Sequence, residues 1–301
     1  METGTRVEKT FKSADTEEWW DVHFTRPLGY WWAVLFMKLS VTPNVVTIMA
    51  MIIGAIGGVL FAFDDLTVNL IGMVLIVLAN LFDSADGQLA RMTNQCSRFG
   101  RILDGFCGDV WFFFIYAALC WRLQEAGWSP FIVWPFAAIV GIYHALQSST
   151  SDYYRNTHLY MLKGESGSEL DNSEKLTEQY KKLILKENFW NKWALYHYID
   201  FTKRQEGNTR HLQQLFGLIR TKFGGTPPES LKEEFLTGSR PLMKWTNILT
   251  FNTRMAFLFF SLIIDLPWLY FMFEMTVLNV LWFYMNWSHE SLSKRLVTKY
   301  A

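Results

Sequence analysis

Four aspartates lie close together in one short stretch of the chain, "DSADGQLARMTNQCSRFGRILDGFCGD", at positions 83, 86, 104 and 109. Asp83 and Asp86 are three residues apart, so a helix would present both carboxylates on one face. Asp104 follows a short connection and would face them from the start of a second helix. Clustered carboxylates are oxygen ligands for hard divalent cations, above all Mg²⁺, and such cations usually also contact substrate phosphates. The stretch therefore predicts a metal site that handles a phosphorylated substrate.

The residues between these aspartates fit the same chemistry. Gly87 has no side chain, which leaves room for a phosphate or another backbone to approach. Arg91 lies one helical turn further and could bind a phosphate oxygen. A structural role as salt-bridge partners would need more basic neighbours than the three nearby, Arg91, Arg98 and Arg101. Carboxylates at the edge of a membrane segment are costly and usually functional, which favours the metal site.

The elements that must position these aspartates are strongly apolar. Half of the 301 residues are hydrophobic, and they form charge-free blocks rather than the stripes of a soluble helix. A helix of about 20 apolar residues crosses the hydrocarbon core of a bilayer. We therefore predict an all-α polytopic membrane protein with six transmembrane helices. Five are built on the uncharged blocks 45–63, 66–82, 110–121, 128–143 and 255–264, the third with an amphipathic approach from Phe99, and the sixth is built on 266–287, whose one charged residue is Glu274.

The distribution of basic residues predicts the orientation. Segments 1–44, 91–101, 151–245 and 288–301 carry 26 of the 28 Lys and Arg residues. By the positive-inside rule, both termini and the aspartate site then face the cytoplasm. The net charge is zero, so the composition implies no nucleic-acid partner. The three cysteines, Cys96, Cys107 and Cys120, have no metal-ligand spacing and are interpreted as reduced thiols.

This pattern divides the chain into four parts. Residues 1–41 form an N-terminal cytoplasmic segment with an interfacial amphipathic helix, anchored by Trp19, Trp20, Trp31 and Trp32. Residues 42–150 hold transmembrane helices 1–4 and the aspartate motif. Residues 151–245 are a polar, helical cytoplasmic insert in which we recognise no catalytic motif. Residues 246–301 hold the last two transmembrane helices and the C-terminal tail.

The spacing of the motif resembles that of the CDP-alcohol phosphotransferase family, also called CDP-alcohol phosphatidyltransferases. Seven fixed positions within 22 residues carry the resemblance: Asp83, Asp86, Gly87, Ala90, Arg91, Gly100 and Asp104. With "TPNVVT" at 42–47, the resemblance covers residues 40–150. It implies two bound divalent ions, Mg²⁺ or Mn²⁺, on Asp83, Asp86 and Asp104, and a further aspartate beside them as general base. It also implies that the cytidine diphosphate group is held by Asn44, Val45, Val46, Thr47, Gly87, Arg91 and Ser97.

The chain departs from the family pattern at the base. The family has an aspartate four residues after the third metal ligand, whereas here position 108 is glycine and Asp109 follows. On a regular helix this shift turns the carboxylate by about 100°. A π-bulge, permitted by Gly105 and Gly108, would restore its direction and make Asp109 the catalytic base and a neighbour of the metal ions. Otherwise Asp109 is a structural residue.

The resemblance implies a transferase of phospholipid synthesis, in which an alcohol attacks the phosphorus distal to cytidine and CMP leaves. Arg155, at the end of the fourth span, and Arg254, at the start of the fifth, could bind an anionic acceptor, as arginines do in phosphatidylinositol phosphate synthases. Arg254 could instead pair with Asp265 or Glu274. We therefore predict CDP-diacylglycerol as the donor and a polar alcohol such as inositol phosphate as the acceptor. The protein is expected to be a homodimer among membrane lipids.

Other interpretations stay open. A related transferase would use CDP-choline or CDP-ethanolamine with a lipid alcohol as acceptor. Membrane prenyltransferases also use aspartate-rich helices, but the second aspartate motif that they need downstream is missing. A transporter or channel would be expected to carry charged residues in several spans, whereas here the charged residues lie together at one edge of the membrane segments. His144 and Gln147, one turn apart, could line the same cavity or simply pack between helices.

Overall fold

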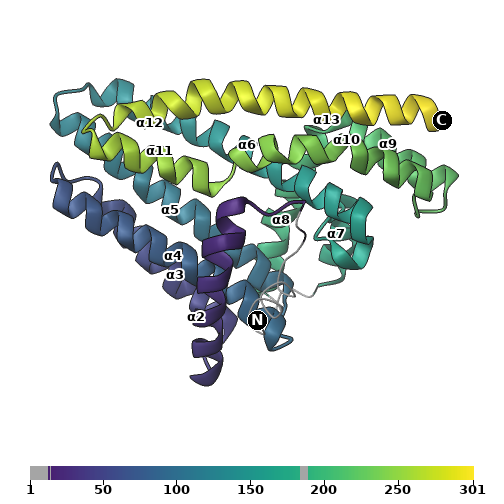
Figure 1. The fold of residues 1–301 in the computed structure, drawn as a ribbon, viewed down its shortest axis with the longest axis horizontal. Coiled ribbons are helices and arrows are strands. Elements are labelled where there is room, and N and C mark those ends of the chain that lie inside the picture. The colour runs from purple at the N-terminus through teal and green to yellow at the C-terminus, as the bar shows by residue number, and fades with distance from the viewer. Residues whose placement is uncertain (1–12, 14, 184–188) are drawn as a thin grey trace. The chain divides into compact units, whose positions relative to one another are not determined.

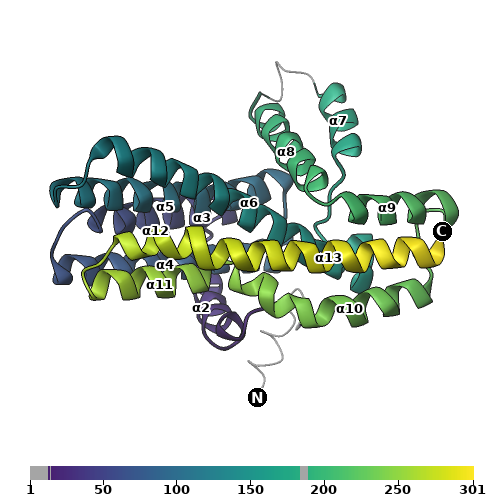
Figure 2. The same ribbon diagram turned by 90° about the horizontal axis from the view of Figure 1, so that it is seen from above.

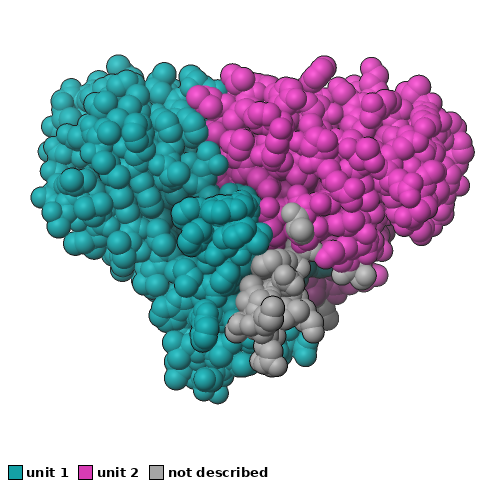
Figure 3. All heavy atoms as spheres, in the orientation of Figure 1, with its two compact units in different colours: residues 1–11, 18–144, 251–276 teal, residues 12–17, 145–250, 277–301 magenta. Residues whose placement is uncertain are grey.

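The computed structural model describes residues 13, 15–183 and 189–301, and all regular secondary structure in these ranges is helical. The prediction of an all-α protein is confirmed. The chain divides into two compact units (Figure 3). Among the described residues, unit 1 comprises 18–144 and 251–276, and unit 2 comprises the remainder.

Unit 1 contains α4 and α5, the two helices that carry the aspartates, and the helices packed with them (Figure 1). Its elements are the π-helix η1 (Asp21–Thr25), α2 (Arg26–Lys38), α3 (Pro43–Leu60), α4 (Leu66–Met92), α5 (Arg98–Glu125), the first part of α6 (Pro130–Lys163), α11 (Phe251–Ile263), α12 (Trp268–Phe273) and the start of the π-helix η3 (Glu274–Leu278). Pro43 begins α3, where its missing N–H costs no helical hydrogen bond. The side chains of Asp65 and Ser97 accept hydrogen bonds from the backbone N–H groups of Val68 and Gly100, and so cap α4 and α5.

Small residues let α3 pack closely against α4 and α5. At Gly54 an added Cβ would lie 2.2 Å from the Trp111 indole nitrogen, so only glycine leaves space for this ring. The same indole N–H donates to the Ala50 carbonyl oxygen at 3.0 Å. At Gly57 an added Cβ would lie 2.9 Å from the Gly72 carbonyl oxygen on α4. These contacts fix the relative position of the three helices that carry the predicted site (Figures 1 and 2).

One buried arginine ties the other ends of these helices together. Arg122, near the end of α5, donates to Asp64 in the α3–α4 loop and to Asp265 in the α11–α12 loop, each at 2.7 Å. Both loops therefore lie at the same end of unit 1. At 1.5 Å per residue, Arg122 lies about 27 Å along α5 from Asp104, close to the thickness of a bilayer's hydrocarbon core.

Five helices in the described part of the chain are long and apolar enough to cross a membrane: α3, α4, α5, α6 and the helix from Trp268 to Tyr300. The remaining predicted span, at 255–264, is α11, which has only 13 residues. It is about 20 Å long, shorter than a hydrocarbon core of about 30 Å. Phe251 at its start packs against Trp111 and Phe112 in the middle of α5. Five predicted spans are thus confirmed as helices of sufficient length, and the sixth is shortened by a turn at residues 249–250.

Unit 2 is built around the C-terminal helix. Its elements are the second part of α6, the 3₁₀ turn η2 (Glu165–Gly167), α7 (Ser173–Lys182), α8 (Phe189–Gly207), α9 (Arg210–Lys222), α10 (Glu229–Ile248), the end of η3 and α13 (Asn279–Tyr300). α9 and α10 flank α13 (Figure 2). The carboxylate of Glu290 on α13 accepts from the backbone N–H groups of His211 and Leu212, at 2.6 and 3.3 Å, and so caps the start of α9. The described residues of the insert 151–245 are mostly helical, as predicted.

Candidate metal and substrate site

Asp83, Asp86 and Asp104 come together in unit 1. One carboxylate oxygen of each lies within 4.8 Å of the others. Asp83 and Asp86 lie near the C-terminal end of α4, and Asp104 lies in the second turn of α5. Asp86 is only 4% exposed, Asp83 is half-buried and Asp104 is exposed. The structure thus brings together the three residues that the sequence proposed as metal ligands.

This set of donors fits a hard divalent cation. Three carboxylates at this separation repel one another, and a bound cation would offset that repulsion. Their oxygens are ligands of the type that Mg²⁺ and Mn²⁺ prefer. The positive charges of Arg26 and Arg91 act on Asp83 and Asp86, respectively.

Two inward-facing side chains hold the carboxylates from behind. The Thr47 hydroxyl on α3 donates to the Asp86 carboxylate. The Cys107 thiol, on α5, is fully buried and interacts with the Asp83 carboxylate. The Cys107 sulfur also lies 3.8 Å from the Thr47 carbonyl oxygen. Groups from α3 and α5 therefore orient the two carboxylates of α4.

Polar residues proposed to hold the cytidine diphosphate group surround two glycines. An added Cβ at Gly100 would lie 3.1 Å from both the Asn44 amide oxygen and the Ser97 hydroxyl oxygen, so these two groups lie together. An added Cβ at Gly87 would lie 3.7 Å from the Arg91 guanidinium. The glycines therefore leave space beside an amide, a hydroxyl and a cation, all of which can bind a nucleotide.

The other residues proposed to bind the substrate differ in how exposed they are and in what their side chains contact. Val45 is 46% exposed, whereas Val46 is fully buried in the core between the helices and offers no side chain to a substrate. The Thr47 hydroxyl donates its hydrogen bond to the Asp86 carboxylate. Arg155 is half-buried on the part of α6 that belongs to unit 2.

Asp109 is not part of the aspartate group. α5 is a regular α-helix from Arg98 to Glu125, and the π-bulge predicted between Asp104 and Asp109 is absent. At about 100° per residue, five residues turn the Asp109 side chain about 140° away from Asp104. Asp109 is exposed on the same side as Phe106 and Phe113, whose side chains are 50% and 67% exposed. The prediction of a bulge is therefore corrected, because the regular helix points Asp109 away from the other carboxylates.

Arg254 on α11 is buried and has a protein partner. It forms an ion pair with Glu274 at the start of η3, and both side chains are 1% exposed. The Tyr270 hydroxyl donates to Glu274 at 2.8 Å. The His144 Nδ1 atom lies 3.1 Å from the Arg254 guanidinium and 2.9 Å from the Tyr116 hydroxyl. Of the two roles left open for Arg254, these contacts support the pairing with Glu274, and His144 belongs to the same network.

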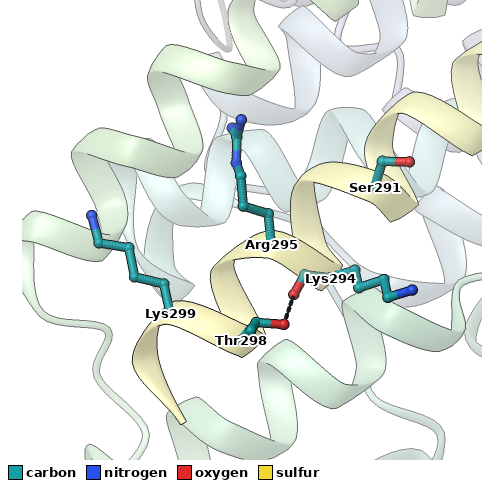
Figure 4. A pocket seen from close by; sticks show the side chains of 5 residues that line it. All are labelled: Ser291, Lys294, Arg295, Thr298 and Lys299. Atoms are coloured by element: carbon teal, nitrogen blue, oxygen red, sulfur yellow. Dashed lines mark hydrogen bonds between the residues drawn. The ribbon is translucent and has the colours of Figure 1, made fainter.

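A cationic hollow lies on α13 in unit 2 (Figure 4). It is lined by Ser291, Lys294, Arg295, Thr298 and Lys299. Lys299 forms an ion pair with Glu234, and the Thr298 hydroxyl donates to the Lys294 carbonyl oxygen at 3.0 Å. The hollow is lined by none of the residues that the sequence proposed for the site.

Comparison with known protein families identifies the segment that carries the aspartate geometry. Residues 40–154 match the family model of CDP-alcohol phosphatidyltransferase. This segment is a CDP-alcohol phosphatidyltransferase domain. The domain contains α3, α4, α5 and much of α6, including all three clustered aspartates. No curated protein and no solved structure matches the chain.

The match confirms the family recognised from the motif. CDP-alcohol phosphatidyltransferases are transferases of substituted phosphate groups, so the prediction of an enzyme of phospholipid synthesis is confirmed at that level. Several apolar helices of spanning length, together with this domain, make the chain an integral membrane protein.

Two residues beside the aspartates were missed from the sequence. Cys107 had a local signal, since it lies three residues after Asp104 and so on the same helix face. Arg26 had no local sequence signal, because it precedes Asp83 by 57 residues and lies outside the matched segment.

Proposed function

We propose that this chain transfers the phosphatidyl group from CDP-diacylglycerol to a polar alcohol, such as inositol phosphate, and releases CMP. The observation that carries the proposal is the group of three aspartates, with ligand atoms within 4.8 Å, inside the CDP-alcohol phosphatidyltransferase domain. The alcohol oxygen forms a bond to the phosphorus distal to cytidine, the bond from that phosphorus to the bridging oxygen breaks, and the hydroxyl proton is released. Outward-facing apolar residues near the site, such as Val45 and Phe106, suit a donor with acyl chains in the bilayer.

Asp83, Asp86 and Asp104 would hold two divalent cations, Mg²⁺ or Mn²⁺. When bound, such cations would neutralise charge that develops on the phosphoryl oxygens. Thr47 keeps Asp86 oriented through its hydrogen bond, and Cys107 does the same for Asp83. Such supporting hydrogen bonds typically change metal affinity by about 10–100-fold.

Asn44, Ser97 and Arg91 are assigned to recognition of the cytidine diphosphate group. The amide of Asn44 and the hydroxyl of Ser97 can form hydrogen bonds with the base or ribose. The guanidinium of Arg91 can bind a phosphate through two parallel hydrogen bonds. The space left by Gly87 and Gly100 lets the nucleotide approach the backbone.

The identity of the proton acceptor is a separate question. A general base must come within about 2.6–3.2 Å of the hydroxyl group whose proton it takes. Asp109 meets this requirement only if α5 departs from regular geometry near Gly105 and Gly108, where an added Cβ would meet no atom within 4 Å. Its role as the catalytic base therefore stays a prediction from the family resemblance.

The acceptor and the setting of the site are also proposals. The pairing of Arg254 with Glu274 engages one of the two arginines predicted for an anionic acceptor, so neutral acceptors have to be tested as well. A CDP-choline or CDP-ethanolamine donor with a lipid alcohol as acceptor is the alternative that such a test distinguishes. The excess of basic residues on one side supports a site and termini that face the cytoplasm.

CMP release by the purified protein tests the proposal. CDP-diacylglycerol is offered with inositol phosphate, inositol, serine or glycerol phosphate, and CDP-choline and CDP-ethanolamine are offered with diacylglycerol. We expect Mg²⁺-dependent CMP release from CDP-diacylglycerol with one of the polar alcohols. Release only from CDP-choline or CDP-ethanolamine would overturn the proposed donor, and no release from any pair would overturn the reaction.

A matched pair of variants ties the activity to the site. Asp83→Asn should reduce CMP release by at least about 100-fold, because it removes a metal ligand. Glu125→Gln makes the same carboxylate-to-amide change at an exposed position near the other end of α5 and should leave the rate unchanged.

A further inference from the structure

We propose that Arg26, which lies outside the CDP-alcohol phosphatidyltransferase domain, is a further residue of the active site and binds the diphosphate group of the donor. The proposal rests on the proposed function, because it requires a diphosphate-containing substrate at the aspartates. Arg26 precedes the matched segment 40–154 and begins α2. Three sets of contacts hold the backbone around Arg26 against the turn of α4 that carries Asp83 and Asp86, and the charge of Arg26 acts on Asp83.

The first contact is a hydrogen bond between α4 and the Arg26 backbone. The side-chain amide of Gln88 donates to the Arg26 carbonyl oxygen at 3.0 Å. Gln88 is fully buried and lies two residues after Asp86. A buried polar group that loses its partner costs about 1–3 kcal/mol, so this bond resists separation of Arg26 from the aspartate-bearing turn of α4.

The second contact is the close approach of α2 to the same turn. An added Cβ at Gly29 would lie 2.8 Å from the Ser84 hydroxyl oxygen and 3.0 Å from the Gln88 amide nitrogen, so a side chain at this position would displace Ser84 or Gln88. Ser84 directly follows Asp83. Further along α2, Phe36 packs edge-on against Phe82, with ring centroids 5.2 Å apart. One face of α2 is therefore fixed against the part of α4 that carries Asp83.

The third contact anchors the segment that precedes Arg26. The amide of Asn252 on α11 donates to both Glu18 and Asp21, each at 3.0 Å. Asp21 begins the π-helix η1, which leads directly into Arg26. Short π-helical turns are uncommon and are frequent at functional sites. Arg26 is thus positioned from both sides, by the anchored η1 before it and by α2 after it.

The charges explain why an arginine at this position would help a diphosphate substrate. Arg26 and Arg91 are cationic side chains whose charges act on Asp83 and Asp86. A divalent cation on the aspartates would add positive charge beside these two guanidinium groups, and the site would then attract a diphosphate. Arg26 can exchange its interaction with Asp83 for one with a phosphate oxygen, and the planar fork of a guanidinium suits that partner.

Calorimetric titration of CDP into the purified full-length protein tests the proposal, with Ca²⁺ present so that no turnover occurs. The comparison includes wild type, Arg26→Gln, Arg26→Lys and Lys38→Gln. Lys38 is exposed in the last turn of α2, so Lys38→Gln removes one positive charge from the same helix and serves as the control. We expect Arg26→Gln to weaken CDP binding about tenfold or more and Arg26→Lys to weaken it less. Lys38→Gln should bind CDP as wild type does.

Binding of Ca²⁺ alone provides the second readout. Arg26→Gln removes a positive charge beside Asp83, so Ca²⁺ affinity should stay the same or rise, and a misfolded variant would lose it. In turnover assays the effect should fall on the KM for the donor more than on kcat.

The CDP and Ca²⁺ titrations distinguish failure of the Arg26 inference from failure of the proposed function. Unchanged CDP affinity in a folded Arg26→Gln variant would overturn the inference and leave the proposed function in place. Loss of Ca²⁺ binding together with CDP binding would mean that Arg26 supports the carboxylates, which also overturns it. Wild-type protein that binds Ca²⁺ but not CDP would overturn the proposed function, and the inference with it.

Discussion

Substitutions at Gly108 and Asp109 test where the catalytic base lies. In the regular helix α5, position 108 is turned about 40° from Asp104, and the two Cα atoms are about 6 Å apart. Position 109 is turned about 140°, and its Cα lies about 9 Å from that of Asp104. The side chain of Asp109 diverges further, because it leaves the helix on the side of the exposed Phe106 and Phe113. A hydroxyl group held at the three clustered aspartates is out of its reach.

If α5 keeps this regular geometry during the reaction, Asp109→Asn should keep its rate within about threefold of wild type. If Asp109 is the general base, as the family resemblance predicts, the same change should cost about 100-fold to 10,000-fold. Gly108→Asp adds a carboxylate on the face of Asp104, where an added Cβ meets no atom within 4 Å, so the variant should fold. At about 7 Å in a solvent-like dielectric, its attraction to a divalent cation is about 1.2 kcal/mol, which is roughly an eightfold gain in metal affinity.

Single-turnover CMP release, with enzyme in excess over bound donor, measures the chemical step separately from product release. A loss of about 100-fold or more in folded Asp109→Asn, with donor binding intact, would refute this reasoning. It would show that α5 rearranges near Gly105 and Gly108 and aims Asp109 at the site. The double variant Gly108→Asp/Asp109→Asn should then recover part of the rate, because its carboxylate has the spacing of the family.

Three further predictions concern the supporting structure. Arg254→Leu should lower the free energy of unfolding in detergent by about 3–5 kcal/mol, because the buried Glu274 loses its ion-pair partner. The double variant Arg254→Leu/Glu274→Leu should recover most of this lost stability. Thr47→Val should weaken Mg²⁺ binding by about tenfold in a direct titration, because Asp86 loses the hydrogen bond from the Thr47 hydroxyl. An unchanged Mg²⁺ affinity would contradict a supporting role of Thr47. Light scattering in mild detergent should give a homodimer, as the family resemblance implies, and a fully active monomer would contradict it.

The spans were predictable where charge-free blocks are long, but their ends were not. The block 66–82 predicted α4, yet this helix continues for ten residues through the aspartates to Met92. Hydropathy marks where side chains become polar and not where the backbone stops being helical. α11 shows the opposite error, because "TNILTFN" at 246–252 has neither Gly nor Pro to signal the turn that shortens the span.

The site was predictable only as far as local spacing reaches. Asp83 and Asp86 share a helix face by their separation, and the short α4–α5 connection returns Asp104 to them. The position of Asp109 could not be deduced, since its residue count fits both a bulged and a regular helix. Arg26 could not be found either, because its place depends on packing between α2 and α4, with Gly29 and Gln88 at the contact.

Two buried arginines of unit 1 are paired with carboxylates of the protein, and the aspartate group is the place where the reaction is expected. At one end, Arg122 is paired with Asp64 and Asp265, and within the helix bundle Arg254 is paired with Glu274. A transporter would need polar groups that can exchange partners with an ion at several depths, whereas each of these arginines is held by carboxylates of the protein. The aspartate group differs, because the ligand atoms of its three carboxylates lie within 4.8 Å of one another, where one cation can contact them all. Clustered carboxylates beside a membrane are costly unless a cation binds them, so this group favours a metal-dependent transferase over a passage for ions.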